Sequence, residues 1–109
     1  MTEGSSTLVR LCGRSDLVPG EARRFDVAGL RVALVRIEDD YYAIGDRCSH
    51  EDVSLAEGEV WAAECELECA KHGSTFDLRT GEPCSLPATK PVPVYEVVVS
   101  DDDISVVVS

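Results

Sequence analysis

Two short segments, each pairing a cysteine with a histidine, constrain this chain more than any other feature of its sequence. The first is Cys48-Ser49-His50 and the second is Cys69-Ala70-Lys71-His72, and the chain has no further histidine. Two thiolates and two imidazoles are the donors of a mixed iron site. Two separate turns must bring these pairs to one point. The sequence therefore predicts a fold that places two loops side by side around a metal centre.

The chemistry that uses this donor set is a [2Fe-2S] cluster in which two imidazoles replace two thiolates on one iron. The replacement changes the formal charge, because four thiolates leave an oxidised cluster anionic whereas two thiolates and two imidazoles leave it neutral. An electron enters a neutral centre more easily, so the reduction potential rises. We expect Cys48 and Cys69 to bind the inner iron. His50 and His72 then bind the outer iron, where the added electron localises and from which it leaves.

A structural zinc site is the alternative interpretation of the same residues, since tetrahedra of two cysteines and two histidines are common. Conventional zinc pairs leave about two to four residues between cysteines and about three to five between histidines. Here each pair mixes the two residue types, and the first pair is separated by a single residue. The spacing favours iron, with zinc as the remaining option.

The residues that follow the second pair resemble those of a known family. They are His72-Gly73-Ser74-Thr75-Phe76-Asp77, then Arg79-Thr80-Gly81-Glu82-Pro83, then Leu86-Pro87-Ala88. They are similar to the second cluster loop, hairpin and proline loop of Rieske ferredoxins, and the resemblance runs from about Asp46 to Val99. The chain looks most like the small ferredoxin subunit of multicomponent non-haem iron oxygenases, including aromatic-ring-hydroxylating dioxygenases. This resemblance implies one [2Fe-2S] cluster with the ligands Cys48, His50, Cys69 and His72.

The resemblance implies an all-β Rieske fold of three antiparallel sheets, with a small cluster-binding subdomain at one tip. Short apolar stretches separated by turn residues agree with it. We expect strands over residues 7–11, 22–27, 30–38, 41–44, 64–68, 75–78, 93–99 and 104–108, and a helical turn only within 53–60. The predicted domain organisation is a flexible N-terminal tail, residues 1–6, followed by one domain, residues 7–109. Its cluster-binding loops span about 46–58 and 69–88.

Two differences from other Rieske proteins concern the loops and the potential. Respiratory and photosynthetic members join their cluster loops by a disulfide, and this chain lacks both of those cysteines, so we expect packing alone to hold the loops. Ser74 stands where high-potential members place a hydroxyl that donates to a bridging sulfide, and Phe76 stands where they place a tyrosine. A potential in the lower part of the range of about −150 to +300 mV is therefore expected. Alternatively, the Ser74 hydroxyl bonds only its own backbone.

Three cysteines remain once the ligands are assigned, namely Cys12, Cys65 and Cys84. An odd number favours reduced thiols. Alternation in Glu64-Cys65-Glu66-Leu67-Glu68 predicts a strand with Cys65 and Leu67 facing the core, although Cys65 could also substitute for Cys69 as a ligand. We expect Cys84 to be a buried thiol, and it is the one most open to oxidation. The segment from Cys84 to Pro87 is expected to shield the cluster.

The net charge of −11 on 109 residues argues against nucleic acid or an anionic membrane as a partner. Partners should instead present basic surfaces. Most acidic residues are expected only to solvate the surface, whereas Glu51 and Asp52 adjoin a ligand and are predicted to form a docking rim. With 44% hydrophobic residues, the chain has no apolar run of membrane-spanning length, and Met1 to Ser6 is too polar for a signal peptide. We expect a cytoplasmic protein.

The function expected from the cluster and the resemblance is one-electron transfer. The protein would accept electrons from a flavoprotein or ferredoxin reductase and pass them to a terminal non-haem iron oxygenase. It is not expected to be an enzyme itself, because both histidines are already used and no nucleophile constellation is present. Two alternatives stay open. One is the small subunit of an assimilatory nitrite reductase, and the other is a redox or accessory protein of iron-sulfur cluster assembly.

Overall fold

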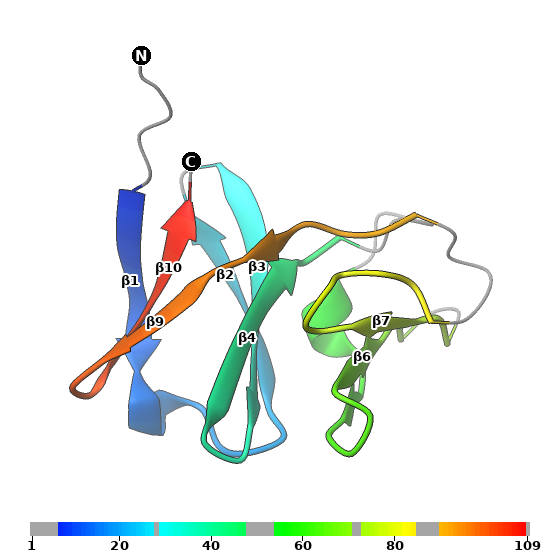
Figure 1. The fold of residues 1–109 in the computed structure, drawn as a ribbon, viewed down its shortest axis with the longest axis horizontal. Coiled ribbons are helices and arrows are strands. Elements are labelled where there is room, and N and C mark those ends of the chain that lie inside the picture. The colour runs from blue at the N-terminus through cyan, green and yellow to red at the C-terminus, as the bar shows by residue number, and fades with distance from the viewer. Residues whose placement is uncertain (1–6, 28, 48–53, 71–72, 85–89, 109) are drawn as a thin grey trace.

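The described residues form an all-β structure in which sheets follow one another along the longest axis (Figure 1). This computed structural model describes residues 7–27, 29–47, 54–70, 73–84 and 90–108. The strands are β1 Thr7–Gly13, β2 Ala22–Val27, β3 Leu30–Ile37, β4 Asp40–Gly45, β5 Val60–Trp61, β6 Glu66–Glu68, β7 Thr75–Asp77, β8 Val94–Tyr95, β9 Val97–Ser100 and β10 Asp103–Val108. Two single 3-10 turns are η1 Arg14–Asp16 and η2 Leu55–Glu57.

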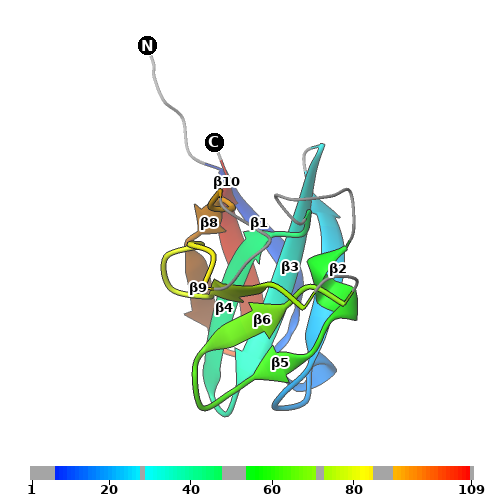
Figure 2. The ribbon, with the colours of Figure 1, turned by 90° about the vertical axis from the view of Figure 1, so that its right-hand side faces the viewer.

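The strands make three antiparallel sheets, as the resemblance to Rieske ferredoxins implied. The first sheet has the order β1-β10-β9, the second β2-β3-β4-β8 and the third β5-β6-β7. The first two face each other at the end of the molecule where β1 begins and β10 ends (Figure 1). The small third sheet forms the opposite end, and Figure 2 shows β5 and β6 lying in front of β3 and β4.

The central strand β3 is buried on both faces and joins two hydrophobic cores. Val32 and Leu34 point into the core shared with the first sheet, where they meet Ile104. Ala33 and Val35 point the other way. The second core, under the third sheet, contains Ala33, Val35, Ile44, Leu55, Leu67, Cys69, Phe76, Leu78 and Val92. A run of apolar residues without alternation is what a strand covered on both sides requires.

Several element boundaries differ from the predicted ones. The stretch predicted as one strand over 93–99 is two strands, because Glu96 separates β8, which pairs with β4, from β9, which pairs with β10. The chain passes from the second sheet to the first at this point. The strand predicted from Glu64 begins at Glu66. The turn η1 and the strand β5 were not predicted, whereas the helical turn within 53–60 is confirmed as η2.

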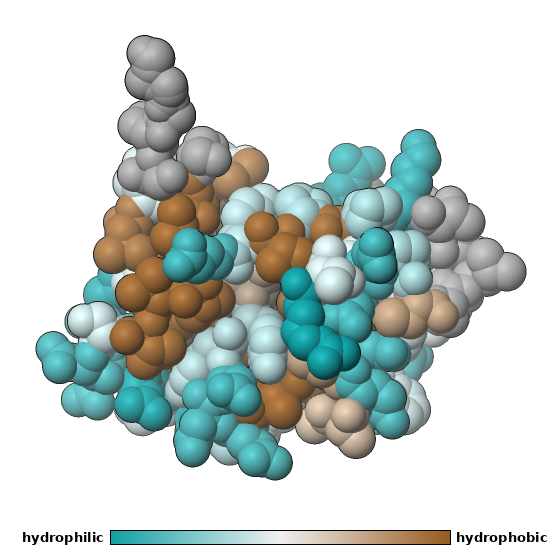
Figure 3. Space-filling view, in the orientation of Figure 1, coloured by the Kyte–Doolittle hydropathy of each residue, from teal (hydrophilic) through white to brown (hydrophobic). Residues whose placement is uncertain are grey.

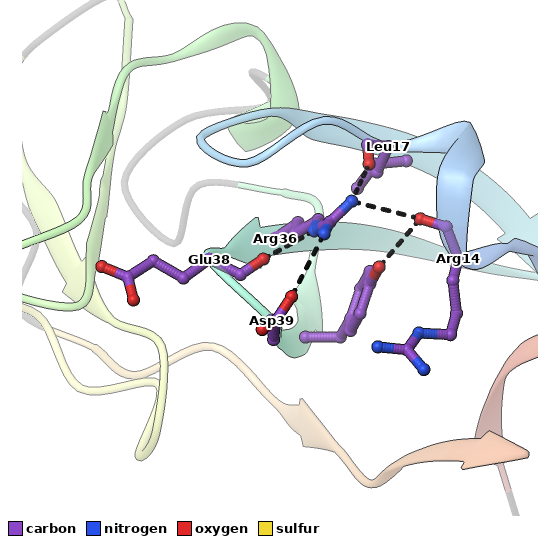
Figure 4. A network of polar contacts seen from close by, with 6 residues as sticks. Arg14, Leu17, Arg36, Glu38 and Asp39 are labelled. Carbon is purple, nitrogen blue, oxygen red and sulfur yellow. Dashed lines mark hydrogen bonds and ion pairs between the residues drawn. The ribbon is translucent and has the colours of Figure 1, made fainter. Parts of the chain in front are cut away.

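A network around Arg36 connects η1 and the residue after it to the β3–β4 turn (Figure 4). The Arg36 guanidinium donates to the carbonyl oxygen of Leu17 at 2.7 Å and to that of Glu38 at 2.6 Å. The Tyr41 hydroxyl donates to the carbonyl oxygen of Arg14 at 2.8 Å, and the guanidinium lies 5.5 Å from the centre of the Tyr41 ring. These bonds fix η1 against the β3–β4 turn.

Apolar side chains gather on the surface over β1, β9 and β10, away from the third sheet (Figure 3). Leu8 is 58% exposed and Val99 is 46% exposed there. Elsewhere on this face polar side chains predominate (Figure 3). Among the described residues, no helix is long and apolar enough to cross a membrane. The predicted tail, residues 1–6, lies outside the described residues.

Candidate metal centre

Of the four predicted ligands, the structure describes Cys69. Its side chain is fully buried in the core beneath the third sheet, one residue beyond the end of β6, and its thiol is free. Cys48, His50 and His72 lie outside the described residues, so their meeting with Cys69 stays a prediction. A buried cysteine packs as a small apolar residue and becomes a thiolate when a metal takes the place of its proton. The spacing from Cys69 to His72 is what makes Cys69 a candidate ligand.

The turn that begins at Cys69 is closed by two backbone hydrogen bonds. The Cys69 N–H donates to the carbonyl oxygen of Ser74 at 2.6 Å, and the Gly73 N–H donates to the carbonyl oxygen of Cys69 at 2.9 Å. Gly73 has a φ of 75°, a left-handed conformation that glycine adopts without strain. The chain then continues into β7, where Thr75 pairs with Glu68. The second predicted loop therefore starts from a fixed point on the third sheet.

The two ends of the first predicted loop are held together by Asp46. Arg47 and Ser54 form an isolated antiparallel bridge, and the Leu55 N–H donates to the Asp46 carbonyl oxygen at 2.7 Å. The buried Asp46 carboxylate accepts hydrogen bonds from the Ser54 hydroxyl at 2.5 Å and from the Ala56 N–H at 2.8 Å. The prediction that packing alone holds the loops is therefore wrong, because a buried carboxylate ties the ends of this one.

The first predicted loop returns to the core beside the second. Gly58 follows η2, and a β-carbon on Gly58 would overlap the carbonyl oxygen of Glu68, the residue before Cys69. The Glu68 N–H also donates to the carbonyl oxygen of Glu59 at 2.9 Å. The chain leaving the first loop thus lies in backbone contact with the strand that leads to the second. Sequence reasoning missed both Asp46 and Gly58, and the only available signal was that Asp46 closely precedes Cys48.

An apolar wall surrounds Cys69. Leu55, Leu67 and Phe76 are fully buried in the same core. Phe76 pairs with Leu67 across β6 and β7 and forms a bridge with Pro83. Ser74 is also fully buried, in the turn that Cys69 opens. The predicted contact between its hydroxyl and a sulfide stays a prediction.

The two nearby cysteines differ from their predicted settings. Cys65 lies in a turn and not in a strand, with a φ of 59°, and it is partly exposed while contacting the core. Its carbonyl oxygen accepts the Leu78 N–H, and a hydrogen bond with its side chain raises the pKa of Tyr42. Leu67 is buried as predicted. Cys84 is exposed, so the expectation of a buried thiol is wrong. The segment 85–89, predicted to shield the cluster, lies outside the described residues.

The donor set and its surroundings fit a [2Fe-2S] cluster. The sequence supplies two cysteines and two histidines in two predicted loops. The chain leaving the first loop, at Gly58 and Glu59, contacts Glu68 at the end of β6, directly before Cys69, where the second loop starts. Within residues 7–27, 29–47, 54–70, 73–84 and 90–108, no group of three or more cysteine, histidine, aspartate or glutamate side chains is placed to hold a metal ion.

Comparison with known proteins agrees with this assignment. The family model of the Rieske [2Fe-2S] domain matches residues 7–96. The ferredoxin subunit of 3-phenylpropionate/cinnamic acid dioxygenase from Escherichia coli strain K12 is 40% identical over 93 residues, which cover 85% of this chain and 86% of that one.

Solved structures of ferredoxins have the same fold. The ferredoxin of carbazole 1,9a-dioxygenase from Nocardioides aromaticivorans IC177 matches with 43% identity and a TM-score of 0.89, covering 92% of this chain and 96% of that one. A chain from a complex of reduced oxygenase and oxidised ferredoxin in carbazole 1,9a-dioxygenase matches with 37% identity and a TM-score of 0.85, covering 91% of each. A putative NADH-dependent nitrite reductase small subunit from Mycobacterium tuberculosis, 22% identical with a TM-score of 0.87 over 97% of this chain and 98% of that one, shares the fold. The chain belongs to the Rieske [2Fe-2S] domain family and holds one [2Fe-2S] cluster.

Proposed function

We propose that this protein is the ferredoxin component of a multicomponent non-haem iron oxygenase. It receives single electrons from a flavoprotein or ferredoxin reductase and passes them to the terminal oxygenase. The observation that carries the proposal is the identity of 40% and 43%, over most of the chain, to ferredoxins of two dioxygenase systems. The protein is an electron-transfer component, and the oxidation of substrate takes place on the oxygenase.

In this proposal Cys48 and Cys69 bind the inner iron, and His50 and His72 bind the outer iron. The cluster, when bound, supplies reversible one-electron chemistry. The protein holds the ligands in place and limits access of water. Burial of Cys69 among Leu55, Leu67 and Phe76 supports the assignment of this thiol to the inner iron. The imidazoles, on the outer iron, are the route by which the electron leaves.

The charge of the third sheet supports partners with basic surfaces. Glu66 and Asp77 stand directly opposite each other on β6 and β7, an arrangement of like charges that costs stability in a sheet. A hydrogen bond and ion pair from Arg79 lower the pKa of Asp77, which keeps this carboxylate charged. Glu68 accepts a hydrogen bond from the Trp61 indole at 2.7 Å. Glu51 and Asp52, the predicted docking rim, lie outside the described residues, and the cytoplasmic location stays a prediction.

The nitrite reductase alternative has less support. The match to a putative nitrite reductase small subunit at 22% identity is a likeness of fold, and the ferredoxin relatives are closer in sequence. Some members of that class lack the cluster ligands, whereas all four are present in this sequence. Iron-sulfur assembly, the other alternative, has no specific observation in its favour.

Two measurements test the proposal in sequence. The protein purified without oxygen is first reduced in a potentiometric titration followed by electron paramagnetic resonance. A rhombic signal with a mean g below the free-electron value, titrating in the lower part of the Rieske range, is expected, and a sample with zinc in place of iron would contradict the cluster assignment. The reduced protein is then mixed in a stopped-flow instrument with a terminal dioxygenase or a sirohaem nitrite reductase. Oxidation of the reduced protein by the nitrite reductase and not by the dioxygenase would overturn the proposed partner.

A further inference from the structure

We infer that Asp46 is a positioning residue for the loop that carries Cys48 and His50, and that its carboxylate acts as a clamp between the ends of that loop. The inference rests on the proposed ligand assignment. The described residues on either side of the loop belong to two different elements. Asp46 directly follows β4, and the chain that returns from the loop enters η2.

The clamp consists of bonds from every polar group of Asp46. Its N–H donates to the carbonyl oxygen of Arg31 on β3 at 2.9 Å, and its carbonyl oxygen accepts the Leu55 N–H at 2.7 Å. One carboxylate oxygen accepts the Ser54 hydroxyl at 2.5 Å and the other accepts the Ala56 N–H at 2.8 Å. One residue therefore connects the second sheet to the beginning of η2, with the predicted loop between.

The carboxylate replaces the usual cap of η2. Ser54 occupies the N-cap position, where a serine hydroxyl ordinarily accepts an N–H from the first turn, but its side chain makes no such bond. The hydroxyl donates to Asp46 instead, and Asp46 accepts the Ala56 N–H that the serine leaves without a partner. The start of η2 is thus set by a residue on the far side of the loop. Asp46 and Ala56 are ten residues apart, so this bond is not part of the local hydrogen bonding of η2.

The burial of the charge indicates that the clamp is specific. Asp46 is fully buried, and a buried carboxylate is costly unless it is hydrogen-bonded or paired. The guanidinium of Arg24 lies 3.9 Å away and is 42% exposed, so this ion pair gives weak compensation. The two short hydrogen bonds from Ser54 and Ala56 therefore provide most of the stabilisation. They are made only when both ends of the loop are in place.

The position of the clamp connects it to the metal centre. Cys48 is two residues beyond Asp46, and η2 places Leu55 in the core that contains Cys69. The hydrogen bonds of Asp46 hold η2, and η2 packs in the same core as Cys69. They therefore also help to fix the distance between the first loop and Cys69. Loss of the clamp should release the loop ends and let iron leave, while the sheets remain folded. Partners that orient metal ligands from outside typically contribute about ten- to a hundredfold in metal retention.

The test compares Asp46→Ala and Asp46→Asn with a control at an exposed aspartate, Asp16→Ala. The Asp16 carboxylate also accepts a backbone N–H, that of Gly13 at 2.8 Å, but in η1 at the other end of the molecule. Each variant is purified with its cluster. Iron release to a chelator is timed, the reduced cluster is recorded by electron paramagnetic resonance, and the thermal midpoint is followed by far-ultraviolet circular dichroism.

Asp46→Ala should shorten the half-life of iron release by about tenfold and shift or broaden the g values. Asp46→Asn keeps a side-chain oxygen for the Ala56 N–H and should recover most of the wild-type half-life. Asp16→Ala should lower the midpoint alone. Wild-type release and g values in Asp46→Ala would overturn the inference, as would equal effects in Asp16→Ala. If Asp46→Ala does not fold, Ser54→Ala, which removes one bond, should show several-fold faster release, and unchanged release there would overturn it. A wild-type protein without a cluster would instead overturn the proposed function.

Discussion

Gly58 and Glu68 pass each other in direct backbone contact, so closely that the space for a side chain at Gly58 is occupied by the Glu68 carbonyl oxygen. The contact joins the chain that leaves the first predicted cluster loop to the residue before Cys69. Rieske proteins with a disulfide between their loops have a covalent connection for this purpose. Here a glycine, a backbone hydrogen bond between the neighbouring Glu59 and Glu68, and the Asp46 carboxylate serve as the connection.

Gly58→Ala should therefore lower the free energy of unfolding by about 3 kcal/mol, because the backbone must move to admit the methyl group. Gly20→Ala is the control, since Gly20 has a φ of 88° with open space around it and should cost only about 1 kcal/mol in backbone strain. Thermal unfolding measures the loss of stability in both variants. Iron release to a chelator measures how well each variant retains its cluster. Faster release is expected for Gly58→Ala alone, and identical behaviour of the two variants would contradict the role of the contact.

Removal of either predicted imidazole ligand should abolish the cluster spectrum. In His50→Ala and His72→Ala, the visible absorption and the rhombic resonance signal are expected to disappear, because one iron loses a ligand. Cys65→Ala is the comparison, since Cys65 lies in a turn and contacts the core without being an assigned ligand. It should lose some stability and keep the cluster. A native spectrum in either histidine variant would refute the ligand assignment.

Ser74→Ala should lower the reduction potential if the serine hydroxyl donates to a bridging sulfide. A hydrogen bond worth about 1 kcal/mol corresponds to roughly 40 mV for a one-electron couple. Ser105→Ala provides a second buried serine for comparison, on β10 in the first sheet, and its potential should match the wild type. The titration that gives the midpoint decides the question. A midpoint unchanged in Ser74→Ala would exclude the contact.

Neutralising the acidic face of the third sheet should slow electron delivery from the reductase at low salt. The variant Glu66→Gln with Glu68→Gln removes two charges beside Cys69 and should reduce the second-order rate several-fold, with the difference vanishing as salt screens the charges. Asp101→Asn with Asp102→Asn removes the same charge at the β9–β10 turn, at the opposite end of the molecule (Figure 1). Equal rates for the two double variants would show that only net charge matters.

Alkylation should distinguish Cys84 from the buried Cys12. Cys84 is exposed, but partial desolvation and the neighbouring Glu66 carboxylate raise the pKa of its thiol. The thiolate is the reactive form, so iodoacetamide should react slowly at pH 7 and faster as the pH rises beyond the ordinary thiol range. Mass spectrometry of the folded protein should find the label on Cys84 first. Earlier labelling of Cys12 would contradict its burial.

The sequence predicted the fold class and most strands because their apolar patterns are local. β2 has the predicted bounds, and β3 ends one residue earlier than expected. The predictions failed where the conformation of a residue depends on a contact with a residue distant in the sequence. Glu96 lies in an apolar stretch, yet the chain changes sheets there to pair with β10. Cys65 fits the alternation of a strand but lies in a turn with a positive φ, and its carbonyl oxygen accepts the Leu78 N–H.

The same distinction applies to the site. The cysteine and histidine pairs could be recognised as candidate ligands from the sequence, because each pair lies within a few adjacent residues. The role of Asp46 depends on Ser54 and Ala56 across the loop, and that of Gly58 depends on Glu68 in another strand. An aspartate at position 46 and a glycine at position 58 do not by themselves indicate which distant residues they contact. Supporting residues of this kind become visible only in three dimensions.

The closed turn at Cys69 has a consequence for the speed of the carrier. Its two backbone hydrogen bonds and the surrounding core leave the thiol few alternative positions, so the sulfur should move little when a bound cluster changes its oxidation state. An environment organised in advance requires little reorganisation when charge arrives. Electron transfer through this protein should then be limited by the meeting of the partners and the distance between their metals, and only slightly by the movement of atoms around the sulfur.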